Sequence, residues 1–111
     1  MIILKVELSN LGVYRGKHAF DLTPAPLNGF SRPVVLFSGK NGAGKTTFVE
    51  AIRLCLHGSL AITGRVSRTM YEDYLAKLIH VPLNSADWPN SAKIVVVFDY
   101  VSTGRRQRYR V

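Results

Sequence analysis

The sequence predicts an α/β fold in which an antiparallel sheet lies beside a central strand and the helix that follows it. In residues 2–8 the apolar residues at positions 2, 4, 6 and 8 share one face and Ile3, Lys5 and Glu7 share the other, which indicates a strand with one buried face. Residues 34–37 show no polar alternation, as expected for a central strand buried on both faces. From Lys45 onward the apolar residues recur at helical spacing. A buried strand followed directly by a helix is typical of α/β proteins.

The composition is that of one globular domain over residues 1–111, with 47% hydrophobic and 20% charged residues. The longest apolar run, residues 94–98, is far too short to span a membrane. The N-terminus has neither the basic segment nor the cleavage site of a signal peptide. Cys55 is the only cysteine, so no internal disulfide can form. We therefore expect a cytoplasmic protein with no membrane partner.

The chain carries a formal net charge of +8, from 15 basic and 7 acidic residues. Basicity on this scale favours a polyanionic partner such as DNA or RNA. Part of the excess lies at the C-terminal end, in Arg105, Arg106, Arg108 and Arg110. We expect the intact protein to contact DNA, and these four arginines are candidate contacts.

A hairpin is predicted at the start of the chain. Residues 17–22 alternate like residues 2–8, so the two segments are expected to pair. Gly12 and Gly16 are predicted to bracket the turn between them. Residues 23–29 contain two prolines and a glycine, which predicts a loop.

Two helices are predicted after residue 44. The first begins at Lys45 and ends at Gly58, which occupies the position of a helix C-cap. Its apolar stripe consists of Phe48, Val49, Ile52, Cys55 and Leu56. The second helix opens with a capping box formed by Thr69 and Glu72 and ends before Pro82. Residues 59–68 and 81–91 are predicted loops. A second hairpin follows, with strands over residues 93–101 and 105–111 and a turn over residues 102–104.

Residues 39–46, Gly-Lys-Asn-Gly-Ala-Gly-Lys-Thr, match the P-loop (Walker A) pattern G-x-x-x-x-G-K-[ST] without a mismatch. Successive backbone N–H groups in such a loop surround phosphate groups, and the following helix directs its N-terminal dipole at them. The glycines permit the positive φ angles and the close approach that the loop requires. The expected nucleotide-binding residues are Gly39, Lys40, Asn41, Gly42, Ala43, Gly44, Lys45, Thr46 and Thr47.

Three side chains of this loop have distinct expected roles. Lys45 places an ammonium group against the β and γ phosphates of ATP. The Thr46 hydroxyl is placed to ligate Mg²⁺, and the Thr47 hydroxyl can bond the α-phosphate. The pattern lies between an apolar strand and an amphipathic helix, which favours a true Mg-ATP site over a chance match.

Asp99 offers an alternative metal ligand. Residues 94–98 form an apolar strand that ends in this acid, which resembles the Walker B pattern that holds Mg²⁺. A Walker B strand leads into a loop over the phosphates, whereas Asp99 leads into a hairpin turn. The hairpin favours a solvent-side role for Asp99. A small P-loop kinase that uses Asp99 stays open as an alternative, as does a nucleotide-binding module without catalysis.

The order of these motifs resembles the N-terminal half of the ATPase head in the SMC-like and SbcC-type family of the ABC superclass. The order comprises an N-terminal strand, Asn10 and Arg15 near the first turn, a second strand, and then Gly-x-Asn-Gly-x-Gly-Lys-Thr-Thr. Within the family the chain most resembles the DndD-type ATPases of the DNA phosphorothioation (DNA sulfur modification) system. The stretches that carry this resemblance are residues 11–16, 32–37, 48–58 and 71–75.

The resemblance implies that residues 1–111 are the N-terminal lobe of an ATPase head. The family's Q-loop glutamine, coiled coil, signature motif, Walker B acids and switch histidine would all lie beyond Val111. The chain is then a fragment or a natural truncation, with no complete set of catalytic residues, and it is expected to bind ATP without hydrolysing it. The intact ATPase would dimerise head to head around two ATP molecules and couple their hydrolysis to DNA. Other DNA modification proteins would be partners, and Arg15 would reach the γ-phosphate.

Overall fold

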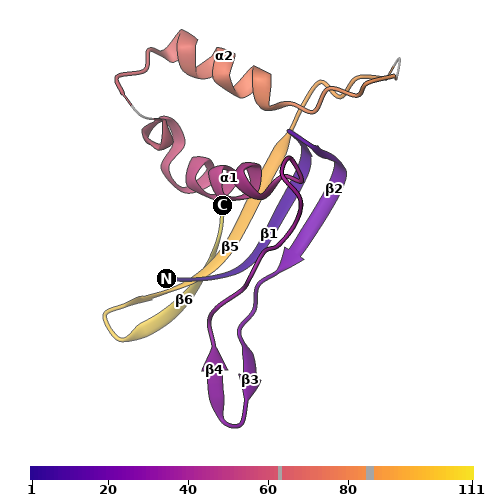
Figure 1. Ribbon diagram of the computed structural model, residues 1–111. Helices are drawn as coiled ribbons and strands as arrows, with labels where there is room; N and C mark the ends of the chain where they lie inside the picture. The colour runs from indigo at the N-terminus through magenta and orange to yellow at the C-terminus, as the bar shows by residue number, and fades with distance from the viewer. Residues whose placement is uncertain (63, 85–86) are drawn as a thin grey trace.

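The computed structural model describes residues 1–62, 64–84 and 87–111 (Figure 1). The strands are β1 (Ile2–Leu11), β2 (Tyr14–Asp21), β3 (Ala25–Leu27), β4 (Phe30–Arg32), β5 (Lys93–Ser102) and β6 (Arg105–Arg110). The helices are α1 (Lys45–His57), the short 3₁₀ helix η1 (Gly58–Ala61) and α2 (Arg68–Leu78). Neither α1 nor α2 is long and apolar enough to cross a membrane.

Four strands form an antiparallel sheet in the order β2-β1-β5-β6, and both predicted hairpins are confirmed. The predicted position of Gly16 beside the first turn is wrong, because β2 begins at Tyr14 and Gly16 lies inside it. The Gly16 N–H donates to Oδ1 of Asn10 over 2.9 Å. The register shifts between Ser9 and Leu11, where Arg15 and Gly16 of β2 both lie opposite Asn10, so β2 carries a bulge at this end of the hairpin.

The core lies between this sheet and α1, which crosses β1 and β5 (Figure 1). Val6, Leu8 and Val96 are fully buried on the sheet face that meets α1. Helix α1 contributes Phe48, Ala51 and Leu54, and Ile52 and Cys55 of the predicted stripe pack beside them. Val49 was predicted in this stripe, but 56% of its surface is exposed because it lies outside the arc that faces the sheet. Gly58 is the C-cap as predicted, and its N–H bonds to the Leu54 oxygen.

The buried central strand predicted over residues 34–37 is wrong. Residues 33–40 form no strand, and the side chains of Val34 and Leu36 are 83% and 89% exposed. A central strand needs a hydrogen-bonded neighbour on each edge. Within the described residues, the strands pair only as β2-β1-β5-β6 and β3-β4, which leaves this segment without a partner. Phe37, the aromatic residue of this segment, packs its ring against the rings of Phe20 and Phe48.

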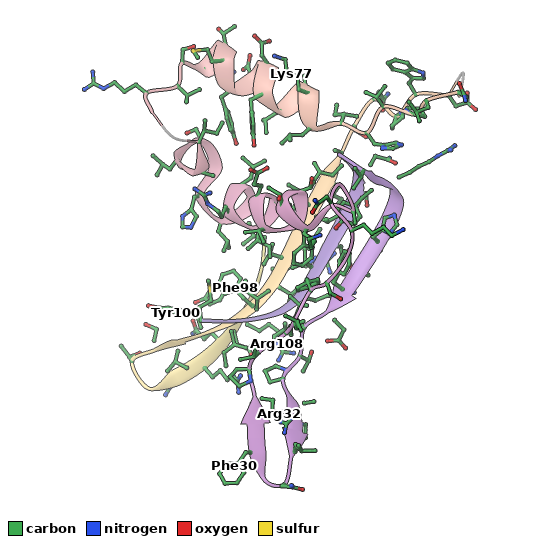
Figure 2. The ribbon with its side chains drawn as sticks, viewed as in Figure 1. Phe30, Arg32, Lys77, Phe98, Tyr100 and Arg108 are labelled. Atoms are coloured by element: carbon green, nitrogen blue, oxygen red, sulfur yellow. The ribbon has the colours of Figure 1, made fainter. Side chains whose placement is uncertain are left out.

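The loop predicted over residues 23–29 is also partly wrong, because β3 and β4 form a small hairpin there. Asn28 and Gly29 both have positive φ angles, 50° and 78°, as a two-residue type I′ turn requires. The Asn-Gly pair is a strong hairpin signal that the two prolines obscured. Figure 2 shows Phe30 and Arg32 on this hairpin, which projects away from both helices.

Helix α2 begins earlier than predicted. Ser67 is the N-cap, and its Oγ accepts from the Met70 N–H over 3.3 Å. Thr69 therefore lies inside the helix, and the predicted capping box with Glu72 is wrong. The Glu72 carboxylate instead pairs with Nε of Arg68 at 2.8 Å. Of the predicted loops over residues 59–68 and 81–91, residues 59–61 belong to η1 and Arg68 opens α2. Residue 63 and residues 85–86 lie outside the described residues, and the remaining loop residues have no regular secondary structure.

The difference between the core and the exposed apolar segment gives a direct test of the fold. Leu8→Ala leaves a cavity at a fully buried position, so it should lower the free energy of unfolding by about 2–5 kcal/mol. The matched substitution Leu36→Ala should lower it by less than about 0.5 kcal/mol, because Leu36 is exposed. Urea titration followed by circular dichroism measures both values. Equal losses at the two positions would contradict the arrangement described.

Candidate functional site

The P-loop segment folds into a compact turn at the N-terminus of α1. Gly42 and Gly44 have φ angles of 79° and 100°, a conformation that strongly favours glycine. The Ala43 N–H donates to the Lys40 oxygen over 3.1 Å and closes the turn. Gly44 is the N-cap of α1, and the first turn of the helix contains no acidic residue. The helix dipole therefore faces the loop without a carboxylate to compensate it, which favours an anion there.

A hollow opens beside this turn. Its lining residues are Val13, Asn41, Gly42, Gly44, Lys45, Thr46 and Thr47. The Lys45 ammonium lies over the loop, where it donates to the oxygens of Gly39 and Lys40, the latter at 2.9 Å. The structure thus brings six of the nine predicted loop residues to one concave, polar surface, and Gly39, Lys40 and Ala43 do not line it. Their individual roles toward a nucleotide stay predictions.

Arg15 is placed elsewhere. It lines a separate hollow together with His80, Val81, Pro82, Leu83 and Asn84. It does not contribute to the lining of the P-loop hollow. Its predicted contact with the γ-phosphate stays a prediction that needs its side chain to move toward the loop.

The turn between β1 and β2 forms one wall of the hollow, which the sequence motifs did not indicate. Val13 lines the hollow, and the Tyr14 hydroxyl donates to the Gly44 oxygen over 3.0 Å. A Cβ atom on Gly44 would lie 2.7 Å from Cγ2 of Val13, so the packing requires glycine here. A Cβ atom on Gly12 would similarly lie 2.9 Å from Cγ2 of Thr47. No residue pattern marks these contacts, because they join segments about 30 residues apart.

The same turn is held from its other side by the end of α2. The Gly12 N–H donates to the Leu78 oxygen over 2.7 Å, and the His80 N–H donates to the Asn10 oxygen over 2.8 Å. The Nδ1 of His80 lies 2.6 Å from the Gly12 oxygen, and it must be the donor because a carbonyl can only accept. The turn therefore lies between the P-loop and residues 78–80, and it is hydrogen-bonded to both segments.

Asp99 lies on the opposite face of the sheet from α1, because it alternates along β5 with Val96 and Phe98, which pack in the core. Its carboxylate accepts from Nε of Arg108 at 2.8 Å and pairs with Nε of Arg106 at 3.0 Å. The predicted hairpin position is confirmed, but the predicted solvent-side exposure is wrong, since Asp99 is only 5% exposed. Arg108 and Arg106 hold the pKa of the Asp99 carboxyl below its usual value.

Glu7 is the second carboxylate buried on this face, with 8% of its surface exposed. Its oxygens lie 2.7 Å from Nζ of Lys5, 3.6 Å from Nζ of Lys17 and 3.8 Å from Nη2 of Arg110. The Lys5 contact lowers the pKa of Glu7, with Lys17 and Arg110 adding to the effect. We call the cations held by these two carboxylates the basic face: Lys5, Lys17, Arg106, Arg108 and Arg110.

Metal binding has only partial support from the chain's own residues. Among the residues that the structure describes, no three His, Cys, Asp or Glu side chains cluster as a metal site. The Thr46 hydroxyl lines the hollow and fits as one oxygen ligand, since protein-bound Mg²⁺ takes much of its coordination from substrate phosphates and water. Asp99, engaged by two arginines, does not line the hollow.

Comparison with known proteins identifies the family. Residues 5–109 match the AAA domain family. The chain belongs to that family. It is 34% identical over 74 residues to the SbcC component of the SbcCD nuclease of Treponema pallidum, which is 66% of this chain and 6% of that protein. It is 39% identical over 59 residues to the same component of the Pseudomonas aeruginosa nuclease, 53% of this chain and 5% of that protein.

The chain therefore matches only about one-twentieth of the length of these relatives. No solved structure matches it. The expected resemblance to SbcC-type ATPases is confirmed at this level, and the narrower resemblance to DndD-type ATPases is not shown.

Asp99 gives a pH-dependent test of the site geometry. Its pKa is lowered in the folded chain, so its ion pairs contribute stability above the pKa of an unfolded aspartate, about 3.9. That contribution is lost as the pH falls through the folded pKa. Asp99→Asn should therefore destabilise the chain at pH 7, and the difference from wild type should shrink below about pH 4.

Urea midpoints measured from pH 7 down to pH 2 test this expectation. Asp73→Asn, at an exposed position on α2, is the matched control and should change little at any pH. A destabilisation by Asp99→Asn that is independent of pH would show that the arginines do not hold the carboxylate as described.

Proposed function

We propose that the chain binds the triphosphate of Mg-ATP in the hollow at the N-terminus of α1. The observation that carries this proposal is the hollow itself, where the loop backbone, Lys45, Thr46 and an uncompensated helix N-terminus meet. Each of these features attracts a compact polyanion. Membership of the AAA domain family supports a nucleotide as the ligand.

Nucleotide binding requires one rearrangement within the loop. The Lys45 ammonium now donates to the oxygens of Gly39 and Lys40, and it would turn toward the β and γ phosphates. Thr46 would ligate Mg²⁺, and Thr47 would bond the α-phosphate. When bound, Mg²⁺ would neutralise charge on the phosphate oxygens. These contacts hold substrate and transition state alike, so they favour binding more than reaction.

For the intact protein we propose an ATP hydrolase of the SbcC type. No acid lines the hollow, so the described residues offer no group beside it to orient an attacking water. In the proposed mechanism two such heads dimerise, each completes the other's ATP site, and closure is coupled to DNA. The curated relatives, which are named as part of a nuclease, support work on a nucleic acid. A role in DNA phosphorothioation, with other DNA modification proteins as partners, rests only on the resemblance of residues 11–16, 32–37, 48–58 and 71–75 to DndD-type ATPases.

The structure supports the two alternative functions to different degrees. The small P-loop kinase has no geometric support, because Asp99 is engaged by two arginines on the opposite face of the sheet from α1. A nucleotide-binding module without catalysis fits the geometry of the chain equally well. Phosphate release by the longer protein that contains this domain distinguishes the hydrolase from the module.

Removing the loop ammonium should remove nucleotide binding. Lys45→Ala should raise the dissociation constant for Mg-ATP at least about 100-fold, because a charge-assisted contact to the β and γ phosphates disappears. Lys77→Ala is the matched control, since Lys77 is an exposed lysine on α2 and does not line the hollow. Isothermal titration calorimetry measures both. Equal affinity of Lys45→Ala and wild type would overturn the proposal.

The same titration tests the proposed metal ligand. Thr46→Ala should weaken binding when Mg²⁺ is present and should change little in EDTA. An equal loss in both buffers would show that the Thr46 hydroxyl contacts the nucleotide and not the metal.

We further propose that the basic face contacts the phosphate backbone of DNA. Its five cations surround two carboxylates, and the arginine side chains remain 58–67% exposed although they are ion-paired. Arg106, Arg108 and Arg110 alternate along β6 and so lie on one side of the sheet. Figure 2 shows Arg108 on this part of the sheet. Cations held in this way fit a regular array of phosphates and carry no base-reading geometry.

The salt dependence of DNA binding tests this surface. Replacing Arg106, Arg108 and Arg110 with Gln should reduce the slope of log K against log salt by up to about 0.9 per lost phosphate contact. Replacing Arg65, Arg68 and Lys77 with Gln removes the same charge from residues away from the sheet and should change the slope little. Fluorescence anisotropy with a duplex measures both. Equal changes in the two triple variants would place the DNA surface elsewhere.

A further inference from the structure

One peptide group links the β1–β2 turn to the phosphate loop. The Gly44 oxygen accepts two hydrogen bonds, from the Phe48 N–H at 2.9 Å and from the Tyr14 hydroxyl at 3.0 Å. The N–H of the same peptide belongs to Lys45, which lines the hollow. A trans peptide is planar, and its C=O and N–H point in opposite directions. Whatever fixes the Gly44 oxygen therefore also fixes the direction of the Lys45 N–H.

The Tyr14 hydroxyl is itself held in a fixed place. Its ring packs edge-on against Phe20 and His18, with centroid distances of 5.9 Å and 5.3 Å. The ring reaches the loop only because Gly44 has no side chain, since a Cβ there would lie 2.9 Å from Cε2 and Cζ of Tyr14. Burial raises the pKa of Tyr14, so the phenol stays protonated and able to donate at neutral pH.

We propose that Tyr14 is a positioning residue for the nucleotide site, whose hydroxyl anchors the Gly44 oxygen and so aims the Lys45 N–H at the bound phosphates. This inference rests on the proposed binding of Mg-ATP in the hollow. The second hydrogen bond on the Gly44 oxygen also polarises the peptide, which makes its N–H a stronger donor to an anion. The helix bond from Phe48 does not depend on Tyr14, so removing the hydroxyl leaves α1 intact.

The test removes the hydroxyl and keeps the ring. Tyr14→Phe should raise the dissociation constants of Mg-ATP and of inorganic tripolyphosphate by the same factor, about 2- to 10-fold, as expected for one hydrogen bond. Tyr109→Phe is the matched control, because its hydroxyl donates to Oε1 of Gln107 on β6, away from the hollow. Replacing Tyr14 with p-aminophenylalanine restores a donor at the same place and should restore affinity.

Amide NMR supplies a readout that loss of packing would not produce. In the nucleotide-free chain, the Lys45 amide proton should shift upfield in Tyr14→Phe, because its peptide is less polarised, and p-aminophenylalanine should reverse the shift. An unchanged Lys45 resonance together with unchanged affinity would overturn the inference. A loss for Mg-ATP without a loss for tripolyphosphate would also overturn it, because Tyr14 would then act on the nucleoside and not on the phosphates.

Failure of this inference is distinguishable from failure of the proposed function. If wild type binds Mg-ATP and Lys45→Ala does not, the phosphate loop is established whatever Tyr14→Phe shows. If Lys45→Ala binds as well as wild type, the site itself is wrong and the role of Tyr14 falls with it. If Tyr14→Phe unfolds below the assay temperature, the variant with p-aminophenylalanine at position 14 is compared with wild type instead. Its affinities for Mg-ATP and for tripolyphosphate should both equal those of wild type.

Discussion

The P-loop and the first hairpin meet at Gly44, where there is no room for a side chain. Val13 and Tyr14 occupy the space that a Cβ would need, and Gly12 packs as closely against Thr47. These contacts fix the loop against the sheet, while Phe48 fixes the helix against the core. The hollow exists because three surfaces are brought together: the curled loop, the N-terminus of α1 and the turn between β1 and β2. A displacement of the turn would alter one wall of the hollow and the anchor of the Gly44 peptide together.

The two faces of the sheet are stabilised by different physical effects. The face toward α1 is apolar, and burial of Val6, Leu8 and Val96 supplies the hydrophobic free energy. The other face is organised around Glu7 and Asp99, whose charges are costly to bury unless cations compensate them. Because the cations remain exposed, solvent screens these ion pairs and their contribution to stability is modest. They also act on geometry, because each carboxylate restrains two or three long side chains that would otherwise sample many rotamers.

Local patterns in the sequence predicted the elements whose structure is decided locally. The strand over residues 2–8, the helix beginning at Lys45, the Gly58 cap and the C-terminal hairpin are confirmed. The predicted alternation fails only at the start of the strand, where a register shift between Ile3 and Lys5 lets Ile3 pack against the core in place of Ile2. The prediction failed where structure depends on distant partners or on competition between nearby signals. Residues 34–37 have the composition of a central strand, yet strand formation needs neighbours that the described residues do not provide. Ser67 occupies the N-cap position of α2 because its Oγ accepts a hydrogen bond from the Met70 N–H, and Thr69 therefore lies within the helix.

The loop motif includes six of the seven residues that line the hollow, but it does not show what holds them there. Tyr14 and Val13 have no spacing that relates them to the loop, and only tertiary packing brings them to it. For Asp99, the sequence predicted the position in the hairpin but not the burial of the side chain. Its hairpin position could be read from the turn that follows, whereas its burial depends on Arg106 and Arg108 from the neighbouring strand.

The exposed apolar residues 34–37 have a consequence for handling this chain in solution. They form a short run of uncharged apolar residues, two of them β-branched and one aromatic, and their backbone groups have no ladder partner among the described residues. Such a segment is a template for cross-β association between copies. Pro33 on one side, which cannot donate a ladder hydrogen bond, and Lys40 on the other act as gatekeepers that limit the length of strand available for stacking. The isolated chain should therefore aggregate more readily at high salt, where the repulsion that comes from its net charge of +8 is screened.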